Sequence, residues 1–334
     1  MSDKQHYRTK GLQKFSASLV VTDGDRLASV DEAARRYLRA ATPDNTRKAY
    51  AGDMRRFMAF CEAHALDALP ATPETVVRYV TWLADHGRKV STIKRATAAI
   101  AKAHRTVELE PPTATEAVKL ALRGIARERH TAQKKAPPVL VAEARALVGA
   151  LNPETNRGAR DRAIILVGFA AALRRSEVVG LDTTDLEFVP EGVVVTVRSS
   201  KTDQTGEGMH KAIHHGENPS TCPVKALRAW LALAEIETGP VFRSIDAGDN
   251  VREERASDRA VDRAIKRAAR LAGLQDRGFS GHSLRAGLAT QAALNGHGAA
   301  DIARQTGHRS LDTVLGYIRV ATRFEGNVTA KIGL

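Results

Sequence analysis

Cysteine is nearly absent from this chain, which has only Cys61 and Cys222 in 334 residues. The two lie far apart and in no CxxC pattern, so the sequence predicts neither a disulfide framework nor a cysteine-based zinc site. Histidine is more frequent, but only His210, His214 and His215 cluster, and no third ligand sharing a strand face is evident. We therefore expect no bound metal and a reducing cytoplasm as the compartment.

Long apolar runs are also missing. No stretch is long enough to span a bilayer, and the polar N-terminus, MSDKQHYRTKGLQKF, lacks the apolar core of a signal peptide. These absences predict a soluble globular chain that does not cross a membrane.

Negative charge is in deficit. The chain has 51 Lys and Arg against 38 Asp and Glu, which gives a formal net charge of +13. The basic residues are spread along the chain, so a polyanion is the simplest partner, with DNA or RNA as the first candidates. On charge alone, a basic but otherwise ordinary enzyme remains an alternative.

The chain contains helical periodicity in two blocks. Residues 1–25 carry mixed charge without a sustained period and predict a flexible lead-in. Helical patterns fill residues 26–130, and the polar, lysine- and proline-containing stretch 131–139 predicts a linker. Residues 140–334 then form a second domain, and 43% hydrophobic content is enough for two cores.

The first block predicts an all-helical bundle. Thr42-Pro43 and Thr72-Pro73 each open a helix, because proline is favoured at the first helical position. Ser91 is expected to cap a third helix, and Thr113 with Glu116 has the spacing of a capping box before a fourth.

The second block is mostly helical with one small β element. A β-branched run at 193–197, turn residues, and a second short run at 209–214 predict a β-hairpin. Helical patterns are expected at residues 141–151, 160–172, 222–233 and 256–271.

Four residues near the C-terminus have spacings that indicate chemistry. His282 and Arg285 are one helical turn apart, and Gly307-His308 precedes a short helix that carries Tyr317 on the flank of an apolar stripe. A buried histidine or a flanking tyrosine alone is more often a packing residue. Together they provide donors and cations around one phenol, which an attack on a phosphodiester requires because charge develops on the phosphate oxygens.

The motif HxxR, followed by GH and by a tyrosine nine residues after that histidine, resembles the C-terminal signature of the tyrosine recombinases, or phage integrase family. Upstream, LRRSEVVGL resembles the family's first box. Together with the two-domain layout, these motifs resemble the Cre-like branch of the family. The matching positions, in the family's order, are Arg174, Glu177, Lys201, His282, Arg285, His308 and Tyr317.

The resemblance implies a role for each position. Tyr317 would attack a backbone phosphate to give a 3′-phosphotyrosyl link, while the two arginines and two histidines stabilise the phosphate. Glu177 would support the site, and His282 would accept the tyrosine proton. Lys201, on the predicted hairpin, would deliver a proton to the departing 5′ oxygen. No ATP, metal or other cofactor is implied.

The helical block resembles the family's core-binding domain, and VSTIKRATAAI matches one of its DNA-facing helices. By this resemblance Arg47, Lys48, Lys94 and Arg95 are candidate DNA contacts. Read without the resemblance, each pair is more typical of a solvated helix face.

The implied fold is mainly α, with the helical core-binding bundle followed by a mostly helical catalytic domain that has a small β-sheet, the DNA breaking-rejoining fold. The implied partner is double-stranded DNA at a short inverted-repeat core site with a spacer. The chain would be a monomer when free and a tetramer on DNA, in a bacterial or phage-type cytoplasm. The resemblance implies that the tail from Phe324 docks on a neighbour, while the sequence alone equally allows a tail folded on its own domain.

Two alternatives remain open at this level. A type IB topoisomerase uses the same chemistry without strand exchange. A non-catalytic, site-specific DNA-binding regulator would have similar basic surfaces, but it would have no need for the tyrosine and its surrounding cations.

Overall fold

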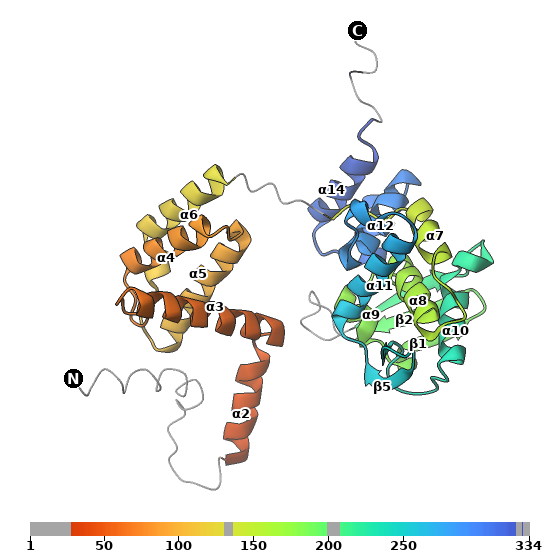
Figure 1. The fold of residues 1–334 in the computed structure, drawn as a ribbon, viewed down its shortest axis with the longest axis horizontal. Coiled ribbons are helices and arrows are strands. Elements are labelled where there is room, and N and C mark those ends of the chain that lie inside the picture. The colour runs from red at the N-terminus through yellow and green to blue at the C-terminus, as the bar shows by residue number, and fades with distance from the viewer. Residues whose placement is uncertain (1–27, 130–135, 199–207, 325–328, 330–334) are drawn as a thin grey trace. The chain divides into compact units, whose positions relative to one another are not determined.

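The computed structural model describes residues 28–129, 136–198, 208–324 and 329. The chain divides into two compact units, residues 1–133 and 134–334 (Figure 1). Each unit has its own apolar core. Among the described residues, no helix is long and apolar enough to cross a membrane.

The first unit is all-helical, as expected. Its elements are α2 (Ala28–Ala40), α3 (Asp44–Ala63), α4 (Pro73–Asp85), α5 (Val90–Thr106), a 3-10 turn (Pro112–Ala114) and α6 (Glu116–Glu128). Helices α3 to α6 surround a core that includes Phe57, Tyr79 and Ile93, each fully buried. Figure 1 shows these helices as one bundle, with α2 extending from the start of α3.

Two of the expected helix starts are confirmed and two caps are wrong. Helix α4 begins at Pro73, and the Thr72 hydroxyl accepts a hydrogen bond from the Thr75 amide at 3.2 Å. Ser91 caps nothing, because α5 has already begun at Val90. The Thr113 capping box does not form, because Pro112 starts a 3-10 turn that contains Thr113 and delays α6.

The second unit combines eight helices with two small sheets among its described residues. Its helices are α7 (Val141–Gly149), α8 (Asn156–Ala170), α9 (Arg175–Gly180), α10 (Pro223–Leu233), α11 (Asp258–Leu271), α12 (Gly281–Leu294), α13 (Ala299–Thr306) and α14 (Leu311–Ala321). Short 3-10 turns lie at Thr183–Asp185, Pro219–Thr221 and Gln275–Arg277. The strands are β1 (Leu186–Val189), β2 (Gly192–Val197), β3 (Met209–His214), β4 (Arg243–Ile245) and β5 (Val251–Arg255).

The predicted hairpin is confirmed as β2 and β3, which pair antiparallel with Val197 opposite Met209 and Val195 opposite Lys211. Strand β1 adds to the other edge of β2, giving the order β1-β2-β3, and β4 pairs with β5 in a separate sheet. The sequence did not indicate β1, β4 or β5, because runs of three to five residues carry little periodicity.

Helix α8 is the centre of the second core, with nearly every residue from Gly158 to Gly168 buried. Helix α12 approaches the chain segment at Val139 so closely that a Cβ at Gly287 would lie 1.9 Å from the Val139 carbonyl oxygen. The Val139 amide donates to the Ser283 carbonyl at 3.0 Å on the same helix. Glycine is therefore required where α12 packs against the start of this unit.

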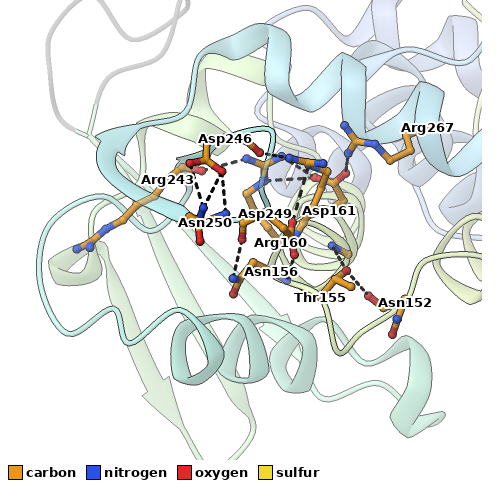
Figure 2. Close-up of polar contacts among 12 residues, drawn as sticks. Asn152, Thr155, Asn156, Arg160, Asp161, Arg243, Asp246, Asp249, Asn250 and Arg267 are labelled. Atoms are coloured by element: carbon orange, nitrogen blue, oxygen red, sulfur yellow. Dashed lines mark hydrogen bonds and ion pairs between the residues drawn. The ribbon is translucent and has the colours of Figure 1, made fainter.

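A buried ion network fixes α8 to α11 (Figure 2). Asp161 is fully buried and accepts from Arg160 Nε and Nη2 at 3.2 and 3.0 Å, while Arg267 of α11 pairs with its second oxygen. Arg160 also donates to the Arg243 carbonyl at 3.1 Å, which ties the network to β4. Three segments far apart in the chain, α8, β4 and α11, are therefore joined by one carboxylate and its arginines.

The turn between β4 and β5 caps the start of α8 (Figure 2). Asp249 accepts from the amides of Asn156 and Arg157 at 2.9 and 3.0 Å. A carboxylate at this place satisfies free amides and complements the positive end of the helix.

Removing the Asp161 carboxylate should destabilise the second unit strongly, because it leaves buried arginine charge without a partner. Asp161→Ala is expected to lower the free energy of unfolding by about 3–5 kcal/mol. The matched control Asp258→Ala, whose carboxylate is half-exposed beside Arg175, should cost less than about 1 kcal/mol. Urea unfolding in a Trp82→Phe background isolates the fluorescence of Trp230, which is buried in this unit. Equal losses in the two variants would contradict the account.

Candidate active site

Arg174 and Glu177 form an ion pair at the start of α9. The Arg174 amide donates to Glu177 Oε2 at 2.8 Å, and its guanidinium Nη1 donates to Oε1 at 2.5 Å. Glu177 is buried, whereas Arg174 keeps a quarter of its side chain exposed. One carboxylate therefore caps the helix and also orients the arginine.

The neighbouring Arg175 is exposed, and its guanidinium pairs with Asp262 and approaches Asp258 at 3.7 Å, both on α11. It therefore links α9 to α11.

Arg285 is buried on α12 with 2% of its surface exposed. Nη1 donates to the Ala172 carbonyl at 2.8 Å, and buried Nη2 has no hydrogen-bond partner among the described residues. Burial lowers the pKa of Arg285 to about 10, and the charge of Arg174 adds to this effect. A buried cation with a spare donor is costly unless an anion completes it.

The carbonyl that holds Arg285 belongs to a strained turn. Ala172 has a φ of +50°, in the left-handed region that alanine seldom adopts. The turn follows the last residue of α8 and leads directly to Arg174. Strain of this kind persists where surrounding contacts impose it, and here those contacts include Arg285.

His308 follows the left-handed Gly307 that ends α13. The Thr306 hydroxyl donates to the Ile302 carbonyl at 2.6 Å, so it accepts from His308 Nδ1 at 2.7 Å. This assignment leaves His308 Nε2 with its lone pair available. Burial lowers the pKa of His308 to about 4, with further lowering from Arg285, Arg174, His282 and Lys211.

Tyr317 lies on α14, which packs against α12 and α13 (Figure 1). Its ring is partly buried against a small apolar cluster and lies 5.9 Å, centroid to centroid, from the His308 ring. Burial raises the pKa of the phenol, and the charge of Arg285 opposes that rise. The tyrosine is therefore anchored beside the cations.

His282 belongs to the first turn of α12 and is exposed. Its pKa is lowered by desolvation and by the charges of Arg285 and Arg174. The expected grouping of Arg174, His282, Arg285, His308 and Tyr317 is therefore present, with every member within electrostatic range of Arg285.

Lys201 lies outside the described residues. The last residue of β2, Val197, and the first of β3, Met209, both line a narrow gap shared with Arg174, Thr306 and Gly307. The end of β2 and the start of β3, which flank Lys201 in the sequence, therefore lie beside Arg174, Thr306 and Gly307.

Sequence reasoning missed two residues here, Lys211 and Thr306. Lys211 is buried on β3, and in the described ranges its ammonium donates to backbone carbonyls alone. A signal was present: Met209, Lys211 and Ile213 alternate with exposed residues on a strand, so the lysine falls on the inward face. His210 and His214 share the opposite, exposed face, as their spacing predicted. Among the described residues no group of three or more metal-ligating side chains occurs.

The expected DNA contacts in the first unit differ in their surroundings. Lys48 and Lys94 are exposed, and no ion pair involves them in the described ranges. Arg47 pairs with Asp44 and donates to the Arg39 carbonyl at 3.1 Å.

Arg95 is held by a buried carboxylate on a neighbouring helix. Its Nε and Nη2 donate to the two oxygens of Asp53 at 2.7 and 3.1 Å, and Arg56 pairs with the same carboxylate. Burial alone would raise the pKa of Asp53, but the hydrogen bonds from both arginines outweigh it and hold that pKa below its usual value. Arg56, which sequence reasoning did not select, therefore lies beside Arg95.

Family models match both units of the chain. The phage integrase family matches residues 139–323, and the phage integrase N-terminal SAM-like domain matches residues 35–110. The first match alone covers more than half of the 334 residues.

Curated relatives extend the likeness along the chain. An integrase/recombinase xerD homolog of Selenomonas ruminantium is 39% identical over 302 residues, covering 90% of this chain and 88% of the relative. Recombinase cre of Escherichia phage P1 is 25% identical over 301 residues, covering 84% and 85%.

Solved structures agree in fold. The Tn1549 transposon integrase in complex with transposon right end DNA aligns with a TM-score of 0.57 at 13% identity, covering 87% of this chain and 95% of that one. A lambda integrase dimer bound to a core site aligns with a TM-score of 0.54 at 16% identity, covering 86% and 93%. Taken with the family match and the relative at 39% identity, the chain belongs to the phage integrase family and is a tyrosine-type, site-specific DNA recombinase.

Proposed function

We propose that the cluster around Arg285 is the recombinase's active site and that Tyr317 is its nucleophile. The observation that carries this proposal is the buried Nη2 of Arg285, which lies near Tyr317 and has no hydrogen-bond partner among the residues that the structure describes, since a phosphate oxygen would supply that partner. The proposed catalytic residues are Arg174, Glu177, Lys201, His282, Arg285, His308 and Tyr317.

In the proposed cleavage step the Tyr317 oxygen forms a bond to phosphorus and the bond to the 5′ oxygen breaks. The phenolic proton passes to His282, and Lys201 gives a proton to the departing 5′ oxygen. Arg174 and Arg285 stabilise the charge on the non-bridging oxygens. The free 5′ hydroxyl of a partner strand then attacks the phosphotyrosyl link, so the energy of the phosphodiester is retained and no ATP is consumed.

His308 responds to the phosphate. In the free protein the surrounding cations and burial keep its ring neutral, with Nε2 unprotonated. An anionic phosphate offsets those cations and favours protonation, because a nearby opposite charge stabilises the charged ring. His308 Nε2 then donates to a phosphate oxygen, while Thr306 holds Nδ1.

The first unit is the proposed core-binding domain, residues 26–130. Its candidate contacts to double-stranded DNA are Arg47, Lys48, Lys94 and the part of Arg95 that Asp53 leaves exposed. Lys94 and Arg95 are adjacent at the start of α5, and Asp53 fixes the arginine's orientation. A preoriented guanidinium loses less entropy on contacting DNA than a free side chain would.

The assembly proposed for strand exchange is a tetramer on two core sites, each an inverted repeat around a short spacer, formed from free monomers. The tail from Phe324 is the candidate for linking protomers. Apart from exposed Phe324 and residue 329, that tail lies outside the described residues.

Tyr317→Phe should bind DNA with wild-type affinity and form no covalent adduct, because only the attacking oxygen is lost. A nicked suicide substrate traps the adduct, which is counted as a denaturation-resistant protein–DNA band. Tyr50→Phe, which changes a tyrosine in the other unit, is the matched control and should form adduct normally. A full adduct yield from Tyr317→Phe would refute Tyr317 as the nucleophile.

Lys94→Ala should weaken binding to specific and unrelated DNA alike, because an exposed lysine contacts phosphate and not bases. The slope of log affinity against log salt should fall by about one. Lys119→Ala, an exposed lysine on α6, serves as the control and should leave the slope unchanged. Identical slopes for both variants would show that Lys94 does not contact phosphate and belongs to a solvated helix face.

A further inference from the structure

Lys211 is placed where lysine seldom occurs. Only 2% of it is exposed, and on β3 it lies opposite the fully buried Val195. No carboxylate pairs with it in the part of the chain that the structure describes. Its Nζ instead donates to the carbonyls of Ala171, Gln305 and Thr306 at 2.8, 2.9 and 3.4 Å.

Two of these contacts reach the turns that carry the active site. Ala171 precedes Ala172, whose carbonyl holds Arg285 Nη1 at 2.8 Å. Thr306 accepts from His308 Nδ1 through its hydroxyl at 2.7 Å. One ammonium therefore joins the backbone that orients the buried arginine to the backbone that orients the histidine.

The same contacts argue against a role for Lys211 in proton delivery. An ammonium has three N–H donors, and here three carbonyls accept them. An acid for the leaving oxygen needs a donor that points at the substrate, and that role is proposed above for Lys201. The buried lysine is suited to holding structure.

We propose that Lys211 is a positioning residue, which fixes the Ala171–Ala172 and Gln305–Thr306 segments so that Arg285 and His308 face the scissile phosphate. The inference rests on the roles proposed above for those two residues. It adds a residue that does not itself touch the substrate.

The charged surroundings make this contact sensitive to pH. The groups facing Lys211 are Arg285 on α12, Arg174 and Glu177 on α9, and His308 after α13. Burial lowers its pKa to about 8, the arginines add to the lowering and Glu177 opposes it. Above that pH the neutral amine has only two N–H donors, so one carbonyl is released and a cation is lost.

The first test compares Lys211→Met with Lys225→Met, which changes an exposed lysine at the start of α10. Single-turnover adduct formation is measured at saturating DNA on the nicked substrate. Lys211→Met should slow it by between about tenfold and a hundredfold, as expected when reacting groups are misplaced. Affinity for DNA should stay within about threefold, since a buried side chain makes no phosphate contact. The control should match wild type, and a Lys211→Met rate equal to wild type overturns the proposal.

A substrate with sulfur in place of the bridging 5′ oxygen separates positioning from acid catalysis. This leaving group needs no proton, so it should restore cleavage in Lys201→Ala and leave Lys211→Met slow. Restoration in Lys211→Met would make Lys211 the acid and overturn the positioning role. Wild type and Tyr317→Phe are run beside them. Adduct in Tyr317→Phe, or none in wild type, would reject the proposed active site itself and not only this inference.

A pH series gives a readout that a purely structural role would not move. At subsaturating sulfur substrate, the ratio of wild-type to Lys211→Met rates should be largest at pH 7 and decrease between pH 8 and 9, where the wild-type amine loses its charge and one of its three donors. A constant ratio contradicts the proposal.

If a thermal unfolding measurement shows that Lys211→Met is not folded, Lys211→Arg replaces it. The cleavage rate of Lys211→Arg should decline less above pH 8 than that of wild type. If both variants unfold, the wild-type profile decides: an unbroken rise through pH 8 and 9 overturns the inference.

Discussion

The proposed active site holds like charges close together before any phosphate is present. Besides burial, Arg174 lowers the pKa of both Arg285 and Lys211, and Arg285 also lowers that of Lys211. Among the described residues, Glu177 is the carboxylate that opposes both shifts. Their repulsion is offset by backbone carbonyls at 171, 172, 305 and 306, which accept without carrying a full charge. Donors fixed in this way need little reorganisation when charge develops in the transition state.

This arrangement needs several distant segments to be rigid at once. The end of α8 supplies the strained turn, β3 supplies Lys211, and the end of α13 supplies the carbonyls and His308. Helix α8 is in turn fixed at its start by Asp249 and within its first half by Asp161 and Arg267. The buried ion network therefore fixes the first half of the helix whose end leads into the strained turn.

The sequence indicated the hairpin, both helical blocks and the cluster of His282, Arg285, His308 and Tyr317, because these follow from local spacing. It did not indicate contacts between residues far apart in the chain. Arg95 and Asp53 are 42 positions apart, and Lys211 and Gln305 are 94 apart, so no helix or strand period links them. The capping box was misplaced for a local reason, since the 3-10 turn that begins at Pro112 shifts the start of α6 past the expected spacing. The inward orientation of Lys211 could have been predicted, because buried and exposed residues alternate along β3.

The identity of the residue that becomes linked to DNA tests the account most directly. Wild-type protein trapped on a nicked substrate can be digested with nuclease and protease, and the peptide that retains a nucleotide located by mass spectrometry. The chain has five tyrosines, and the account predicts that the nucleotide is on Tyr317, linked through the 3′ phosphate. A nucleotide on Tyr7, Tyr37, Tyr50 or Tyr79, or on a residue other than tyrosine, would contradict it.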